Sequence, residues 1–311
     1  MAADTQNLVD IILDSYSKYD TTVKIESAHM LNKDVLIEVA EEIRKILFPG
    51  FFSEHNIRKE YLSFIVGERL EFIQYNLKKQ ITRALDDDDL RNGVKHDDIS
   101  ERAENIVYEF IKSIPKVREY LYTDIQAAYD GDPAASNTDE IIFSYPGLFA
   151  VTIYRIAHEL WLLDVPMIPR IMTEYAHSKT GIDIHPGAQI GKYFFIDHGT
   201  GIVIGSTTEI GENVKIYQGV TLGALSTRHG QLLHGVKRHP TIGNNVTIYS
   251  GTSVLGGSTV IGNDVTIGGN ALIVSSIPDG MKVSIRNPEL QYSKGISPDD
   301  SDEEGFWDWI I

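Results

Sequence analysis

Three pairs of polar residues are the groups in this chain best suited to proton transfer. They are Asp183 with His185, Asp197 with His198, and Arg238 with His239. A histidine titrates near neutral pH, and a carboxylate on its second ring nitrogen fixes the tautomer and stabilises the imidazolium formed when the ring takes a proton. The pairs therefore predict general-base chemistry by a histidine that an aspartate orients.

The absence of cysteine removes the main competing chemistries. The chain has 311 residues, none of them cysteine, and no G-x-S-x-G motif. Disulfides, thiolate nucleophiles and cysteine-ligated zinc are excluded, and covalent catalysis has few candidates left. A histidine base fits better.

Two further polar residues have ordinary structural interpretations. Asp132 precedes Pro133, a pair typical of a helix start, where aspartate caps and proline fits the first turn. On these grounds alone, we interpret Asp132 as a helix cap. His158 lies in a helical pattern over residues 145–163, and we interpret it as a structural histidine.

A six-residue repeat organises residues 184–273. An aliphatic residue occupies each of thirteen phase positions, which are Ile184, Ile190, Ile196, Ile204, Ile210, Ile216, Leu222, Ile242, Ile248, Val254, Ile261, Ile267 and Ile273. A period of six fits neither a helix face nor one alternating strand. It fits three short strands per coil of about 18 residues, stacked into a prism around an aliphatic interior.

Glycine, asparagine and aspartate mark the corners of this prism. Glycine directly follows seven phase positions, and Asn213, Asn245, Asp264 and Asn270 stand three residues after four of the same positions. We expect both kinds of residue to supply the positive φ that sharp bends require.

The repeat is interrupted at three points. Two extra residues come before Ile204, one before Ile261, and a long loop before Ile242. Insertions in a solenoid are extruded on its outside, where binding and catalytic groups tend to lie. We therefore expect the titratable pairs beside these interruptions to point outward and form the site. Asp183 and His198 are a little under one coil apart, so the winding brings them close.

The residues before the repeat follow helical spacing. Apolar residues recur three and four apart at Val35, Val39, Ile43, Ile46 and Leu47, and at Ile99, Ala103, Ile106, Val107, Phe110, Ile111 and Ile114. The sequence predicts an α+β chain: an all-helical domain over 1–180, a catalytic prism with an extruded loop over 181–288, and an acidic, flexible tail over 289–311.

Charge and hydropathy restrict the partners. A formal charge of −16 argues against nucleic acid and anionic membranes. No window approaches 18 apolar residues, and the first twenty residues lack the apolar core of a signal peptide. We expect a cytoplasmic protein.

The last residues form a large apolar cluster after an acidic stretch. The cluster comprises Phe306, Trp307, Trp309, Ile310 and Ile311. Either it folds back onto the chain's own surface, or it docks into a partner's pocket with the terminal carboxylate as a polar anchor.

Three strings, in this order, carry a resemblance to a known family. They are Asp183-Ile184-His185-Pro186, Asp197-His198-Gly199-Thr200-Gly201 and Arg238-His239-Pro240. On a hexapeptide prism behind a helical domain, they resemble the serine O-acetyltransferases from about residue 132 to 288. The resemblance implies a left-handed parallel β-helix.

The resemblance also implies roles for the site residues. It makes His198 the general base for the hydroxyl of L-serine, oriented by Asp183, in direct attack on acetyl-CoA. Asp132, Asp197, Arg238 and His239 match positions that bind the amino acid, with Arg238 suited to its carboxylate. Acetyl-CoA is a co-substrate, and neither a permanently bound cofactor nor a metal is expected.

The coenzyme end departs from the family pattern. Many members have a Gly-Gly-Thr-Gly-like run after the position of Leu222, whereas this chain has Gly223-Ala224-Leu225-Ser226 and a longer loop after it. We assign Gly223, Ala224 and Gly268 to the coenzyme.

The resemblance extends to assembly and pathway. Members are trimers or hexamers with acetyl-CoA between neighbouring prisms, act in cysteine biosynthesis and are commonly inhibited by cysteine. Their partner, O-acetylserine sulfhydrylase, accepts a C-terminal isoleucine such as Ile311.

Three other functions stay open. A related acetyltransferase would use a sugar or another small acceptor. A carbonic anhydrase of the same prism would hold zinc between subunits, with His198 and His239 as ligands but no convincing third. A scaffold without enzymatic activity would act only through its tail.

Overall fold

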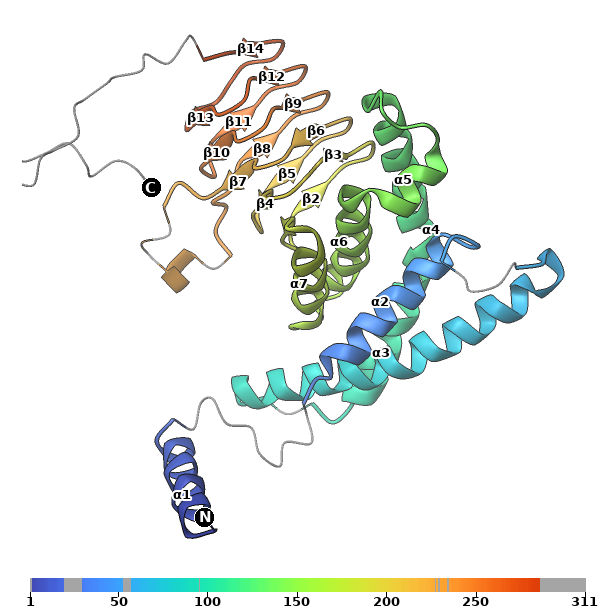
Figure 1. The fold of residues 1–311 in the computed structure, drawn as a ribbon, viewed down its shortest axis with the longest axis vertical. Helices are drawn as coiled ribbons and strands as arrows, with labels where there is room; N and C mark the ends of the chain where they lie inside the picture. Colours follow the sequence, from blue (N-terminus) through green and yellow to red (C-terminus); the bar gives the residue numbers. More distant parts are fainter. Residues whose placement is uncertain are drawn as a thin grey trace, which may run out of the picture.

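A helical region precedes a stack of short parallel strands in the computed structural model (Figure 1). The structure describes residues 2–19, 30–52, 57–94, 96–226, 228, 230–233 and 235–285. The helices are α1 Ala2–Lys18, α2 Lys33–Leu47, α3 Leu62–Asn92, α4 Ile99–Gly131, α5 Thr138–Ser144, α6 Pro146–Leu162 and α7 Ile168–Thr180, with a 3₁₀ turn at Lys59–Tyr61. Within these residues, no helix combines the length and apolarity needed to cross a bilayer.

Local sequence explains how the helices begin and pack. The side chain of Asn32 caps α2 by accepting hydrogen bonds from the backbone amides of Asp34 and Val35 at 3.0 and 3.2 Å. Val39, Ile43 and Leu47 lie on the buried face of that helix, which confirms the spacing read from the sequence. Helices α2, α3, α4, α6 and α7 pack on one another.

Three parallel sheets form the solenoid, one on each side of the prism. Sheet A has the order β1-β4-β7-β10-β13, sheet B β11-β8-β5-β2, and sheet C β14-β12-β9-β6-β3. The strands of sheet A are Asp183–Ile184, Val203–Ile204, Thr221–Gly223, Ser253–Leu255 and Leu272–Ile273 in chain order. Those of sheet B are β2 Gln189–Ile190, β5 Glu209–Ile210, β8 Thr241–Ile242 and β11 Val260–Ile261. Those of sheet C are β3 Phe195–Asp197, β6 Lys215–Tyr217, β9 Thr247–Ile248, β12 Thr266–Ile267 and β14 Lys282–Val283.

The phase positions line the interior of this solenoid, as predicted. Twelve of the thirteen are buried, and pairing keeps them in register, with Ile184 beside Ile204 and Ile204 beside Leu222. Ile273 is only partly buried, because β13 is the edge strand of sheet A and no further strand pairs beyond it in the described residues. The predicted helical region and parallel β-helix are therefore confirmed, whereas the predicted domain limits at residues 180 and 288 stay predictions.

The corner rule holds for the asparagines and aspartate but is wrong for the glycines. Asn213, Asn245, Asp264 and Asn270 have φ between 56° and 58°, and Asn213 and Asn245 donate side-chain bonds up the stack, to Asn245 and Asp264. None of the seven glycines after phase positions has a positive φ.

Close approach between coils explains four of these glycines instead. A Cβ on Gly191 would lie 2.6 Å from the carbonyl oxygen of Gly211, and one on Gly211 would lie 2.8 Å from that of Gly243. Gly243 and Gly262 are confined in the same way, and all four directly follow strands of sheet B. This edge of the prism is formed by backbone stacked on backbone.

A buried ion pair attaches the helical region to the first coil. Arg155 of α6 donates to both carboxylate oxygens of Asp124 of α4, at 2.6 and 2.9 Å. The same guanidinium reaches the carbonyl oxygens of Ile190 and Gly191, and Asp124 accepts from the amide of Phe194 at 3.0 Å. Helices α4 and α6 consequently hold the strand that ends in Asp197.

Candidate active site

His198 lies on the edge where sheet C turns into sheet A. It follows the last residue of β3, and its backbone has a φ of 59°, unusual for a residue with a Cβ. Its side chain is 72% exposed, and its Nε2 lies 3.7 Å from a carboxylate oxygen of Asp197. The turn of residues 198–202 contains the predicted two-residue interruption, so the imidazole is placed outward as expected.

Asp132 approaches this edge as the C-cap of α4. The interpretation of Asp132 as a helix start is wrong, because α5 begins at Thr138 with Asn137 as its N-cap. The side chain of Asp132 accepts a 2.6 Å hydrogen bond from the Tyr145 hydroxyl and a 2.8 Å bond from the backbone amide of Ala134. These bonds, first that of Tyr145, lower the pKa of Asp132, with the charges of Lys215 and His198 adding to the effect. Burial, followed by the bond to Asp132, raises the pKa of Tyr145.

Lys215 joins the end of α4 to Asp197. Its Nζ donates to the carbonyl oxygen of Gly131 at 2.7 Å and lies 3.4 Å from Asp197. It also stands over the rings of Phe195 and Tyr217. The structure thus assembles one cluster of His198, Asp197 and Asp132, with Lys215 as its cation.

Asp183 has a different partner in the structure. Its carboxylate lies 3.3 Å from Nη1 of Arg170 on α7, and Arg170 also pairs with Glu174. In the described part of the chain, no hydrogen bond joins Asp183 to His198. The backbones that carry them do meet, because Gly201 donates to the carbonyl of Gly181 at 2.8 Å and Asp183 donates to that of Ile202 at 2.9 Å.

One side-chain group in the described residues has the donor types of a metal site. Glu174, His177 and Asp183 offer ligand atoms within 4.8 Å of one another. Arg170 pairs with both carboxylates of this group, so its two anions already share a cation.

Arg238 and His239 lie on another edge, where sheet A turns into sheet B. Arg238 donates to the Ser206 hydroxyl at 2.8 Å and to the carbonyl of Leu233 at 3.0 Å. The prediction that the titratable groups point outward is wrong for His239, whose side chain is buried against Gly205 and Thr207. Burial, with the charges of Arg238 and Lys237, lowers its pKa to about 4.

The residues assigned to the coenzyme divide between the same two edges. Gly223 ends β7 and Ala224 follows it, both where sheet A turns into sheet B. Gly268 follows β12, where sheet C turns into sheet A, and a Cβ there would lie 3.2 Å from the carbonyl of Val283. One chain therefore does not bring the three together.

Sequence reasoning missed four neighbours of the candidate site residues, which are Tyr145, Lys215, Arg170 and Thr207. Tyr145 is 13 residues from Asp132, and Lys215 is 84 residues from Gly131. Each belongs to a pattern already explained by a helix or a strand, so nothing in the sequence marked it.

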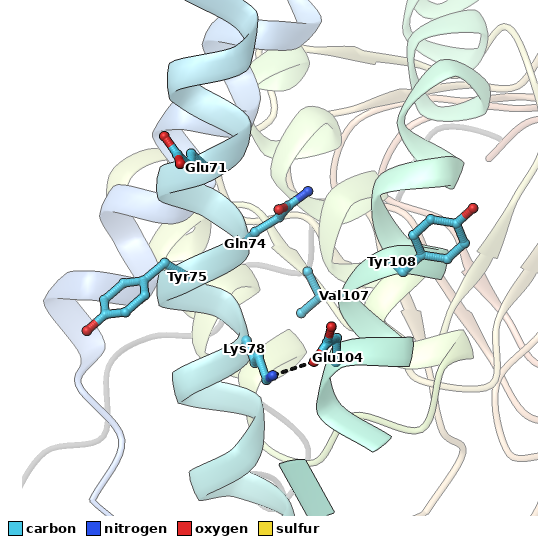
Figure 2. A pocket seen from close by; sticks show the side chains of 7 residues that line it. All are labelled: Glu71, Gln74, Tyr75, Lys78, Glu104, Val107 and Tyr108. Atoms are coloured by element: carbon cyan, nitrogen blue, oxygen red, sulfur yellow. Dashed lines mark hydrogen bonds and ion pairs between the residues drawn. The ribbon is translucent and has the colours of Figure 1, made fainter. Parts of the chain in front are cut away.

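A hollow between α3 and α4 is remote from these groups (Figure 2). It encloses about 360 Å³ and is lined by Glu71, Gln74, Tyr75, Lys78, Glu104, Val107 and Tyr108. The one ion pair drawn there joins Lys78 to Glu104 at 2.5 Å, with no histidine among the lining residues. It therefore lacks the imidazole groups that the prism edges carry.

Known proteins share both the sequence and the architecture of this chain. No protein-family model matches it. A plasmid serine acetyltransferase of Synechococcus elongatus is 42% identical over 263 residues, covering 82% of each chain. The crystal structure of serine acetyltransferase isoform 3 from Entamoeba histolytica, in complex with cysteine, superposes with a TM-score of 0.69 at 38% identity. It covers 94% of this chain and 96% of its own.

A solved serine acetyltransferase in complex with CoA has the same fold, with a TM-score of 0.50, 26% identity, and coverage of 80% of this chain and 95% of its own. Identity and coverage of this extent, on a helical region followed by a parallel solenoid, mean that the chain is an acyltransferase and belongs to the serine acetyltransferase family.

Proposed function

We propose that this protein transfers the acetyl group of acetyl-CoA to the hydroxyl of L-serine, giving O-acetylserine for cysteine biosynthesis in the cytoplasm. The observation that carries the proposal is the cluster of His198, Asp197 and Asp132 on one exposed edge of a family member's prism. A basic ring beside two carboxylates suits a substrate with a hydroxyl to deprotonate and an ammonium to bind.

The reaction proceeds by direct transfer in this proposal. His198 takes the proton of the serine hydroxyl as its oxygen attacks the thioester carbonyl carbon. The carbon–sulfur bond then breaks, and His198 returns the proton to the departing CoA thiolate. Asp132 and Asp197 bind the ammonium group, Arg238 pairs with the carboxylate, and His239 adds a further contact.

Asp183 is the proposed orienting carboxylate of His198. The exposed imidazole of His198 is free to turn, and the backbones of residues 181–183 and 199–202 are hydrogen-bonded side by side. A turn of the ring away from Asp197, with release of Asp183 from Arg170, would bring the pair together. Asp197 is the competing candidate for the same role.

We also propose that a second copy of the chain completes each site. His198 lies on the prism edge where the strands of sheet A begin, and Arg238 lies on the edge where they end. One side of the prism, about six residues long, separates these two edges by roughly 20 Å. Free serine is too short to bridge that separation. A trimer, alone or paired as a hexamer, would bring the His198 edge of one prism against the Arg238 edge of the next. Acetyl-CoA would then lie between them, contacting Gly223 and Ala224 of one chain and Gly268 of the other.

Mixed oligomers test this arrangement. Co-expressed His198→Ala and Arg238→Ala chains are expected to recover about a quarter of wild-type sites, because some interfaces then combine the two intact edges. Thiol release by the purified mixture, compared with each variant alone, measures the recovery. Activity no higher than that of the separate variants would count against shared sites.

Tyr145→Phe is expected to shift the acid side of the pH profile upward. The hydrogen bond from Tyr145 lowers the pKa of Asp132 and so keeps its carboxylate charged as the pH falls. Without that bond Asp132 takes up a proton at higher pH, so the additional loss of kcat/KM for serine that Asp132 adds to the loss from protonation of His198 should begin at a higher pH. Thr138→Val, at the start of α5, serves as a control; the same acid side of the profile in Tyr145→Phe and wild type would contradict the role.

Thiol release from acetyl-CoA with and without L-serine tests the proposed function itself. Serine-dependent release supports it, whereas release that requires a sugar or another acceptor instead would favour the alternative, a related acetyltransferase. Inhibition by cysteine competitive with serine would place both amino acids in one site.

The proposed protein partner is O-acetylserine sulfhydrylase, bound through Ile311. The tail lies outside the described residues, so this proposal rests on the sequence. Deletion of Ile310 and Ile311 is expected to leave acetyl transfer intact and abolish co-purification with the sulfhydrylase. Unchanged co-purification would refute the docking role.

A further inference from the structure

Thr207 makes four hydrogen bonds to Arg238 and His239 at the end of the long loop. Its Oγ1 accepts from the backbone amides of Arg238 and His239, at 3.0 and 3.1 Å. The same oxygen lies 2.8 Å from Nδ1 of His239, and the backbone amide of Thr207 donates to that nitrogen at 3.1 Å. One threonine thus contacts both the backbone and the ring of a candidate substrate-binding residue.

These contacts determine where the imidazole proton lies. The Thr207 oxygen already accepts two N–H groups, so its own proton is available to Nδ1. Because Nδ1 then receives an O–H and an N–H, it has no room for a proton of its own. A neutral ring in this setting carries its proton on Nε2.

The surroundings of the ring oppose a second proton. The residue His239 is 7% exposed, and a Cβ on Gly205 would lie 2.2 Å from its Nε2. The charged groups around it are Arg238 and Lys237 on its own segment, and Lys237 in turn pairs with Glu209 at 3.0 Å. His185 faces it from the first coil, and burial, with Arg170, Arg238 and His239, lowers the pKa of His185 to about 4. Both rings are therefore neutral near pH 7.

We propose that Thr207 is a positioning residue that fixes His239 as the neutral Nε2–H tautomer, so that His239 serves as a hydrogen-bond donor to the acceptor amino acid. This inference rests on the proposed function, in which His239 contacts that amino acid. An Nε2–H group binds a carboxylate or hydroxyl oxygen and offers nothing to an ammonium group. The two histidines then have different tasks: His198 moves a proton, and His239 only donates a hydrogen bond.

Nitrogen-15 NMR of the histidine rings tests the tautomer without any need for activity. The His239 signals are assigned by their loss in His239→Gln. The wild-type protein and Thr207→Ser are expected to show a proton on Nε2 and no ring titration above about pH 5. Thr207→Val removes the hydroxyl at nearly constant volume and is expected to give mixed tautomers and titration nearer pH 6.5.

Two outcomes would overturn the proposal. One is a wild-type ring with its proton on Nδ1. The other is a folded Thr207→Val protein whose ring shifts and titration match those of the wild type. The first needs only the wild-type protein and the His239→Gln variant used for assignment, so the test survives if Thr207→Val does not fold.

Kinetics then connects the tautomer to binding. Thr207→Val should raise KM for the amino acid about tenfold with a smaller change in kcat, and Thr207→Ser should restore KM. A tautomer that changes in Thr207→Val while KM stays at the wild-type value would refute the donor role. Absence of serine-dependent thiol release in the wild type would instead refute the proposed function, leaving the NMR result for Thr207 intact.

Discussion

His198→Ala is expected to lower kcat by at least about 10²-fold, the low end for loss of a general base. The imidazole stands on an exposed turn with a positive φ and contributes little to the packed interior, so folding should be unaffected. Initial rates of thiol release at saturating serine and acetyl-CoA measure the change. Activity within a few-fold of wild type would remove His198 from the mechanism.

Two companion variants decide which carboxylate orients the ring. If Asp183 leaves Arg170 to pair with His198, Asp183→Asn should lower kcat by at least about tenfold, and Asp197→Asn should chiefly raise KM for serine. The reverse pattern would assign orientation to Asp197, whose oxygen is 3.7 Å from the ring in the structure. Solution size measurements on both variants control for loss of the oligomer.

Asp124→Ala is expected to reduce the free energy of unfolding by about 3–5 kcal/mol, the range for breaking a buried ion pair. The side chains of Asp124 and Arg155 are 1% and 6% exposed, and removal of the carboxylate leaves a guanidinium buried without its anion. The amide of Phe194 also loses its acceptor. Urea denaturation followed by circular dichroism measures the loss.

A double variant separates charge from packing. Asp124→Leu combined with Arg155→Met removes both charges and retains apolar volume, so it should recover part of the stability lost in Asp124→Ala. Equal destabilisation by the double variant would mean that the bonds of Arg155 to the first coil, and not the isolated charge, dominate. A change below about 1 kcal/mol in Asp124→Ala would contradict the structural role altogether.

The fold was predictable because the repeat depends on short-range rules. Aliphatic residues at a fixed spacing form the interior, and each asparagine at a corner tolerates the positive φ that its own turn requires. The role of the glycines was misread, since the atoms nearest to a Cβ on Gly211 belong to Asn244 and Gly243 of the next coil and not to its own turn. The sequence of a single six-residue repeat does not show which residues of the next coil it contacts.

The sequence predicted which residues are candidates for the site but not how they are arranged. Motif residues could be named, yet their division between two edges depends on which sheet each follows, and the partners of Asp183 and Asp132 came from helices. Arg170 and Tyr145 reach those carboxylates through packing of α7 and α6 against the prism. Long-range docking of this kind leaves no periodic trace in the sequence.

The backbone-lined edge at the ends of the sheet B strands limits how this protein can change length. Both other edges carry added residues, at 198–202 and in the loop after β7, where chain can loop outward without separating the coils. At the glycine edge, even one methyl group would meet the neighbouring backbone. The solenoid itself can therefore accommodate added residues at two corners of the triangle, while the third must keep its length.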